Sequence, residues 1–419
     1  MASMRDYGTV TAAYWAFTLT DGALRMLVLL HFHRLGYSPL DIAVLFLLYE
    51  AMGIITNFIG GWIGSRFGLR LTLFAGLAVQ IAALTMLSFV DPAWIAAVSV
   101  AYVMMSQALS GIAKDLTKMS SKSAVKLVVA AGDQGGLFKW VAILTGSKNA
   151  LKGIGFLLGG VLLQTFGFQI SLWAMAGMLA LVLFGTTLLV QADLGRAKTR
   201  IRSRDLFSKT RDINFLSAAR IFLFASRDVW FVVGVPIFLY EQAGWRFDQV
   251  GAFMAVWVVG YGIVQALVPG LLGRGSSGSA AGLAKVWGAI LLALPALLAI
   301  ALTPGGPVAV SGEYGTVVLV AGLLVFGIVF AINSSLHSYL IVAYSDADKV
   351  AMNVGFYYMA NAVGRFGGTL LSGVLYQLYG LTGTLWMSAV LIGIAVLFTL
   401  PLARPTGEPS VKQETGNNE

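Results

Sequence analysis

The feature that most constrains this chain is a succession of long apolar stretches separated by short polar segments. We count twelve, each about 18–28 residues long, near 9–33, 40–63, 71–90, 94–117, 138–163, 169–191, 213–240, 249–272, 285–303, 315–341, 351–377 and 383–402. Only helices and closed barrels satisfy every backbone group inside lipid. The stretches lack the alternation of apolar and polar residues that marks strands. The sequence therefore predicts an all-α polytopic membrane protein with twelve transmembrane helices.

Composition excludes several other classes of protein. Residues are 58% hydrophobic and 11% charged, whereas soluble domains carry about 25% charged residues. The formal net charge of +9 lies mostly between apolar stretches, so it predicts cytoplasmic loops rather than a nucleic-acid partner. There is no cysteine, no metal-ligand spacing, no nucleotide-binding loop and no nucleophile–base set. We expect no cofactor, no metal, no enzymatic activity and no direct use of ATP.

Basic residues fix the orientation of the helices. With a cytoplasmic N-terminus, the inner segments hold 20 Lys and Arg residues and the outer segments hold two, Arg34 and Arg246. This asymmetry predicts that both termini are cytoplasmic. The protein is expected to be monomeric, to cross the cell inner membrane many times, and to have the lipid bilayer as its surroundings.

The longest polar break, 191–212, divides the stretches six and six. The two sides also match in sequence: Gly160–Gly167 resembles Gly373–Gly380, and this register places Lys152 on Arg365. Two six-helix halves in parallel repeat, joined by a long cytoplasmic loop, describe the major facilitator architecture. We predict an N-terminal bundle at 1–190, a basic linker at 191–212, a C-terminal bundle at 213–402 and a disordered tail at 403–419.

A short basic segment between the second and third stretches supports that architecture. Residues 61–70 read GWIGSRFGLR and resemble the facilitator loop signature of glycines and basic residues, although Ser65 stands where that signature has an aspartate. Arg66 and Arg70 are its basic residues, and we regard them as gating candidates.

The apolar stretches contain more basic than acidic side chains. The basic ones are Arg25, Lys148, Lys152, Arg220, Arg227 and Arg365, and the acidic ones are Asp21, Glu50 and Asp228. Asp21 and Arg25 could pair on one helix. Arg227 and Asp228 point about 100° apart, so each is expected to need a partner elsewhere. Even with every acid paired, about three cations remain, which favours an anionic ligand over purely structural pairing.

Roles for these residues follow from depth and repeat position. The candidates for substrate contact are Lys148, Lys152, Arg365, Arg25, Arg227, Asn149 and Asn361. Candidates for proton coupling are Asp21, Glu50 and Asp228, with static ion pairing as the alternative. Arg220 lies nearer the cytoplasm, at the expected mouth. The stripe Lys114, Lys118, Lys122 and Lys126 indicates either a face toward lipid headgroups or, at Lys114, an anion-attracting mouth.

Four segments carry a family resemblance: 14–43, 107–123, 139–153 and 220–232. They resemble the organoarsenical efflux permeases of bacterial arsenic-resistance operons, which are major facilitators. The resemblance implies export of 1-arseno-3-phosphoglycerate, an ester that glyceraldehyde-3-phosphate dehydrogenase makes from arsenate, so that enzyme is a functional partner. The residues alone leave open a transporter of another phosphorylated or carboxylated metabolite, a non-transporting membrane receptor, or a lipid scramblase.

Overall fold

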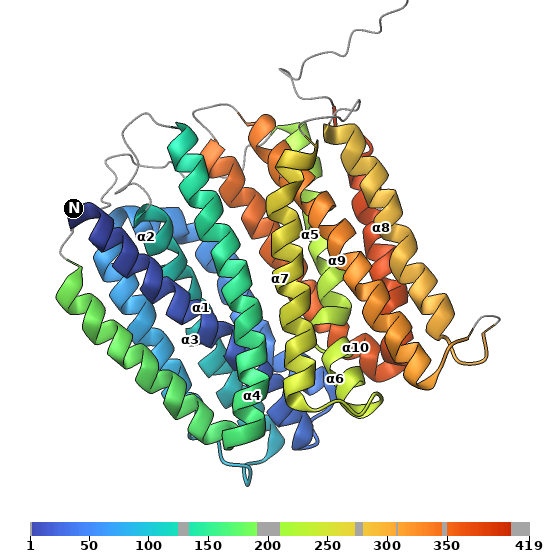
Figure 1. Ribbon diagram of the computed structural model, residues 1–419, viewed down its shortest axis with the longest axis horizontal. Coiled ribbons are helices and arrows are strands. Elements are labelled where there is room, and N and C mark those ends of the chain that lie inside the picture. The colour runs from blue at the N-terminus through green and yellow to red at the C-terminus, as the bar shows by residue number, and fades with distance from the viewer. Residues whose placement is uncertain are drawn as a thin grey trace, which may run out of the picture.

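The computed structural model describes residues 2–124, 134–190, 210–272, 280–306, 309–345 and 350–403. Within these ranges the chain forms ten helices and no strand, and the long helices run side by side (Figure 1). The all-α fold expected from the sequence is therefore confirmed for the described residues. Their bounds are α1 Ala2–Arg34, α2 Pro39–Leu87, α3 Ala96–Ala124, α4 Gln134–Leu189, α5 Arg211–Phe231, α6 Gly234–Glu241, α7 Phe247–Leu272, α8 Ala280–Leu302, α9 Gly312–Ala343 and α10 Val350–Thr399.

Three of the helices are long enough to hold two membrane crossings each. Non-helical glycines with positive φ interrupt α2, α4 and α10, at Gly68 (75°), Gly167 (76°) and Gly380 (62°). Glycine has no Cβ, so it adopts positive φ without the steric cost that other residues incur. The sequence predicted polar loops at these points, for example at 64–70. The structure instead keeps the backbone helical up to a single glycine.

The expected spans fall on these helices with shifted ends. Each of α2, α4 and α10 covers two expected spans, and α5 together with α6 covers the seventh. Among the described residues, nine stretches are long and apolar enough to cross a membrane, and two of them, at 146–189 and 353–399, contain a kink glycine. Helix α5 begins at Arg211, so the last two residues predicted for the linker are helical. The rest of the linker up to 209, and the tail from 404, lie outside the described residues.

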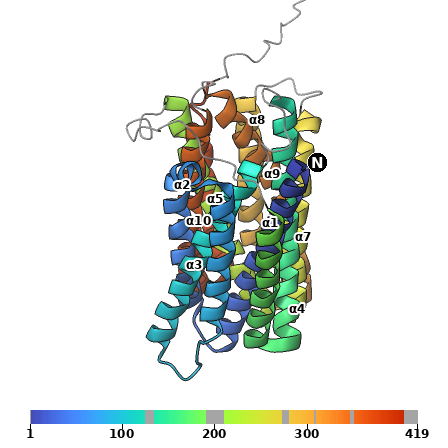
Figure 2. The same cartoon turned by 90° about the vertical axis from the view of Figure 1, so that its left-hand side faces the viewer.

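The segments before and after the linker occupy different parts of the molecule. Helices α1, α3 and α4 lie on the left of Figure 1, while α5 and α7 to α9 lie on the right. Seen from the side, the helices run along one common direction (Figure 2). The two parts meet where α2 packs against α10 and α4 packs against α7. We call them the N-terminal and C-terminal bundles.

The bundles contact each other closely at the ends predicted to face away from the cytoplasm. A Cβ added at Gly160 of α4 would overlap the carbonyl oxygen of Phe247, at the start of α7. One added at Gly373 of α10 would lie 2.6 Å from the carbonyl oxygen of Pro39, at the start of α2. These two glycines occupy matching positions in the repeat. They let the bundles close the outer end by direct backbone packing.

Polar contacts reinforce the same outer closure. The Leu40 amide donates to Gln377 Oε1 at 3.2 Å, joining α2 to α10. The Nε2 atom of His33 lies 3.1 Å from Glu241 Oε1, joining the outer end of α1 to α6. The outer ends of both bundles are therefore joined by backbone packing and by these polar contacts.

Candidate functional site

A cavity of about 260 Å³ lies between the two bundles. Eight helices line it, namely α1 to α5, α7, α9 and α10. Its charged lining residues are Arg25, Lys114, Lys118, Lys148, Lys152, Arg220, Arg227 and Arg365, together with Asp21, Glu50, Asp115 and Asp228. Among the residues that the structure describes, the lining has eight basic and four acidic side chains, an excess of four positive charges. This exceeds the three expected from the sequence, because Lys114, Lys118 and Asp115 also line the cavity.

Twelve of the fourteen residues singled out from the sequence line this cavity. They are the seven candidates for substrate contact, the three candidates for proton coupling, Lys114 and Arg220. Arg70 lies elsewhere, with its guanidinium carbon 5.4 Å from the ring centre of Phe74. The side chain of Arg66 lies outside the described residues.

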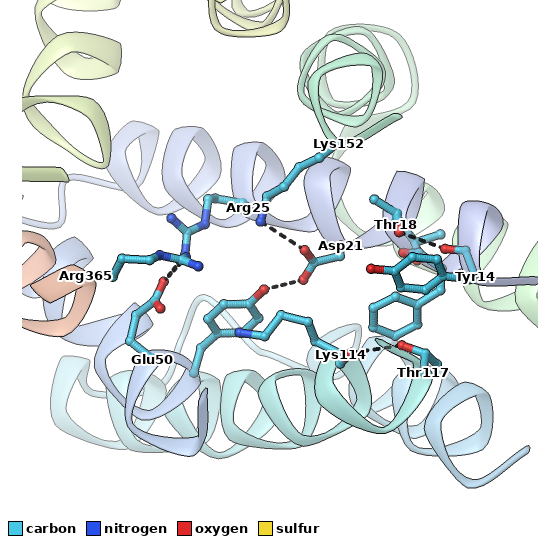
Figure 3. A network of polar contacts seen from close by, with 12 residues as sticks. Tyr14, Thr18, Asp21, Arg25, Glu50, Lys114, Thr117, Lys152 and Arg365 are labelled. Carbon is cyan, nitrogen blue, oxygen red and sulfur yellow. Dashed lines mark hydrogen bonds and ion pairs between the residues drawn. The ribbon is translucent and has the colours of Figure 1, made fainter. Parts of the chain in front are cut away.

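In the N-terminal bundle, an acid of α1 pairs with a lysine of α4. Lys152 Nζ lies 3.1 Å from Asp21 Oδ2, and the Tyr49 hydroxyl of α2 donates to Asp21 Oδ1 at 2.6 Å. Figure 3 shows Lys152 reaching toward Asp21 from the neighbouring helix. The helical spacing allowed Asp21 to pair with Arg25, but both residues find partners on other helices. The side chains of Asp21 and Arg25 line the cavity, where charged residues from six helices, α1 to α5 and α10, come together.

The C-terminal bundle contains the matching pair. Arg365 Nε of α10 lies 3.4 Å from Asp228 Oδ2 of α5, at ion-pair distance but without hydrogen-bond alignment. Arg365 and Lys152 are counterparts in the register that aligns Gly160 with Gly373. The first spans of the two halves align in a second register, which places Gly36 on Gly244, and there Asp228 falls one residue from the counterpart of Asp21. Each bundle therefore joins a cation of its fifth expected span to an acid of its first.

One pairing prediction was wrong. Arg227 and Asp228 were expected to need separate partners, yet Arg227 Nε donates to Asp228 Oδ1 at 2.6 Å. The arginine side chain is long enough to curl around its helix and reach the adjacent carboxylate. Its guanidinium also lies 4.9 Å from the ring centre of Phe224 and 5.6 Å from that of Phe231.

Glu50 of α2 connects the two bundles at the centre of the cavity. Its Oε1 atom accepts a hydrogen bond from Arg25 at 2.6 Å and another from Arg365, also at 2.6 Å. Figure 3 shows the carboxylate of Glu50 beside both guanidinium groups. The side chain of Glu50 is 1% exposed, so these charge-assisted bonds are shielded from solvent.

Two lysines of α3 also line the cavity. Lys114 Nζ sits 3.9 Å from the ring centre of Tyr49. Lys118 donates to Asn57 at 2.7 Å and lies 3.4 Å from Asp115 Oδ1. Lys114 and Lys118 therefore line the cavity between the bundles. The side chains of Lys122 and Lys126 lie outside the described residues.

The cavity extends from the middle of the helices toward the predicted cytoplasmic side. Its lining includes Lys118, near the inner end of α3, and Tyr358, near the inner end of α10. The outer ends of the bundles are closed by the contacts at Gly160 and Gly373. The described contacts therefore close the cavity at the predicted outer end, and its lining continues toward the predicted cytoplasmic end.

A comparison with family models decides how to classify this architecture. The model described as Major Facilitator Superfamily matches residues 9–338. The chain belongs to the major facilitator superfamily. A crystal structure of a point mutant of the nucleoside transporter NupG has the same fold, with a TM-score of 0.69. It is 16% identical, and the alignment covers 95% of this chain and 98% of that one.

A search of curated protein sequences finds no significant match. The family and its fold make this chain a multi-pass membrane protein, and they indicate a secondary transporter rather than an enzyme. At 16% identity the likeness to the nucleoside transporter concerns the fold alone.

Several lining residues of this major facilitator were missed from the sequence. The C-terminal wall carries aromatic side chains, at Phe224, Phe231, Trp257, Tyr261 and Tyr358. Trp257 and Tyr261 are stacked, with their ring planes 3° apart. Aromatic residues are common in apolar helices, so their presence alone does not indicate a cavity. The signal available in the sequence was that Trp257 and Tyr261 lie one turn apart, on the same face of α7.

The same wall holds Arg220 by polar and aromatic contacts. Its Nη1 atom donates to Ser334 Oγ at 3.0 Å, and its guanidinium carbon lies 4.0 Å from the ring centre of Phe224. Lysines thus gather in the N-terminal bundle, while this transporter places arginines among aromatic rings in the C-terminal bundle.

Proposed function

We propose that this major facilitator is a secondary transporter that exports an organic oxyanion from the cytoplasm by alternating access. The observation that carries the proposal is the excess of four positive charges among the described residues that line the cavity between the bundles. Burying unneutralised cations in a membrane protein is costly, and an anionic ligand offsets that cost. The predicted cytoplasmic opening puts the cavity where a cytoplasmic substrate enters.

The proposed substrate is 1-arseno-3-phosphoglycerate. The segments that resemble organoarsenical efflux permeases support this choice, and all four contain charged cavity residues, among them Arg25, Lys114, Lys152 and Arg227. The ester carries a phosphate and an arsenate group. Arginine binds such oxyanions with a planar fork, whereas lysine acts as a point charge, so a mixed set suits a ligand with several anionic oxygens.

The remaining parts of the proposal concern route and energy. Lys114 and Arg220 attract the anion at the cytoplasmic mouth. Arg66 and Arg70, in the basic segment 61–70, take part in gating. Asp21 is the candidate for proton coupling, since its carboxylate contacts both a lysine and a tyrosine hydroxyl. The protein acts as a monomer in the cell inner membrane. Glyceraldehyde-3-phosphate dehydrogenase supplies the substrate without needing to bind the transporter.

Uptake into everted membrane vesicles tests the proposed substrate. The cytoplasmic face of such vesicles is outside, so exported substrate accumulates within them. With the dehydrogenase, its substrates and radiolabelled arsenate outside, we expect labelled arsenic to accumulate well above the level in vesicles lacking the transporter. Leaving out glyceraldehyde 3-phosphate should return the signal to background, because free arsenate is not the proposed cargo.

Two further arms separate the alternatives. Accumulation of a labelled phosphate ester in place of arsenic would identify a transporter of another phosphorylated metabolite. Movement of labelled lipid between leaflets of reconstituted liposomes, without any substrate gradient, would identify a scramblase. If the vesicles take up none of the anions tested, the proposal is contradicted and a non-transporting receptor becomes the favoured alternative.

A further inference from the structure

Glu50 occupies a position that the other acids of the cavity do not share. Its Oε1 atom accepts from Arg25 of the N-terminal bundle and from Arg365 of the C-terminal bundle, both at 2.6 Å. Two guanidinium groups from opposite bundles therefore converge on a single oxygen. The side chain is 1% exposed although the residue lines the cavity.

The repeat distinguishes Glu50 from Asp21 and Asp228. Those two acids lie within one residue of corresponding positions, and each pairs with a cation inside its own bundle. In the register that aligns 36–37 with 244–245, the counterpart of Glu50 is Val258. Glu50 is thus not required by the internal pairing that the two halves share. Its carboxylate adds an anion to the site where the bundles meet.

Arginine recognises carboxylate and phosphate through the same N–H donors and with similar geometry. A place where two arginines converge is accordingly an oxyanion position. In this structure the oxyanion is supplied by the protein itself. An incoming substrate anion and the Glu50 carboxylate compete for the same donors, because only one of them fits between the two guanidinium groups at a time.

We propose that Glu50 is a resident counter-anion, which fills the oxyanion position of the empty transporter and is displaced when substrate binds. The inference rests on the proposed function, since it deepens the account of the same cavity. The displaced carboxylate releases Arg365, so substrate binding breaks the ion pair that joins α2 to α10 in the cavity, while their contacts at the outer end remain. Without substrate, Glu50 neutralises the two arginines and keeps the bundles joined at mid-depth.

Chemical rescue of Glu50→Ala tests the proposal without requiring a known substrate. The truncation leaves two buried arginines without their shared acceptor, so the melting temperature of the purified protein should fall. Formate should restore at least half of the loss by taking the vacated position. Formamide has a similar shape but no charge, and it should restore none. Rescue by formate alone would show that the position between the two arginines accepts an exogenous oxyanion, and the next measurement tests whether Glu50 competes with substrate for it.

Glu50→Gln provides a second measurement, because it keeps the shape and removes the charge. The variant lacks the competing anion, and we expect it to bind 3-phosphoglycerate, titrated by calorimetry, about tenfold more tightly than the wild type. The matched control is Glu313→Gln, at the exposed start of α9, which should bind like the wild type.

Equal rescue by formate and formamide, or no gain in affinity for 3-phosphoglycerate in Glu50→Gln, would overturn the proposal. These outcomes are separate from those of the vesicle experiment. If vesicles accumulate labelled arsenic while Glu50→Gln binds anions no better than the wild type, the transport function stands and the counter-anion fails. If the variant gains affinity but vesicles take up no arsenic, the substrate is wrong and the counter-anion stands.

Discussion

Replacing Arg365 with glutamine should reduce transport of labelled arsenic into everted vesicles at least 100-fold. Arg365 pairs with Glu50 across the bundles and with Asp228 inside its own. Both acids have side chains only 1% exposed, so the variant leaves buried negative charge partly uncompensated. We expect the free energy of unfolding to fall by about 3 kcal/mol, at the lower end for a broken buried ion pair, because each acid keeps another arginine.

The control for this variant removes an arginine that the cavity does not use. Arg246 forms an exposed ion pair with Asp248 at the outer start of α7, and its side chain is 65% exposed. Such surface pairs contribute at most about 1 kcal/mol, so Arg246→Gln should transport and unfold like the wild type. If Arg365→Gln is expressed normally and transports at a near-normal rate, then transport requires neither substrate binding by Arg365 nor its ion pair across the bundles.

Replacing Gly373 with valine should leave the outer end of the transporter unable to close. A Cβ at this position would lie 2.5 Å from Ala43 Cβ and 2.6 Å from the carbonyl oxygen of Pro39. Because the second contact is with backbone, α2 and α10 must separate to accommodate the side chain. Alternating access needs both closed states, so transport should fall at least tenfold. Gly160→Val, against Phe247, should do the same.

The absence of cysteine makes this prediction directly measurable. A single cysteine introduced at Ala362, which lines the cavity, reports which side has access to it. In Gly373→Val, a membrane-impermeant thiol reagent applied to the outer face should label this cysteine much faster than in the parent. Gly367→Val is the control, since a Cβ there has no neighbour within 4 Å. Labelling and transport that match this control would refute the assignment of Gly373 to the outer closure.

The positions of the cavity residues were largely predictable because charge in lipid is costly. Lys152 and Arg365 were identified as buried cations at matching depths, and both line the cavity. Depth along a helix follows from a rise of about 1.5 Å per residue, so the sequence indicates which charges meet at one level. The kinks were not predicted, because the polar residues at these points indicated loops, whereas a single glycine with positive φ is enough to join two helices there.

The pairing of those charges could not be predicted in the same way. Which acid meets which base depends on the rotation and neighbours of each helix, and these come from packing rather than from spacing along one chain. Helical spacing allowed Asp21 to meet Arg25 and kept Arg227 from Asp228, and the structure shows the opposite in both cases. Asp115 was overlooked because its place in a basic stripe resembled a solvated surface.

Arsenate resistance of Lys148→Ala and Lys152→Ala tests the central claim most directly. Both lysines line the cavity on α4, and the claim is that the cations of this cavity bind the exported oxyanion. The host is an arsenic-sensitive strain that also expresses glyceraldehyde-3-phosphate dehydrogenase, with each variant present at the wild-type level. The account predicts that the wild type confers resistance and that each variant loses most of it. Full resistance in both variants would contradict the account.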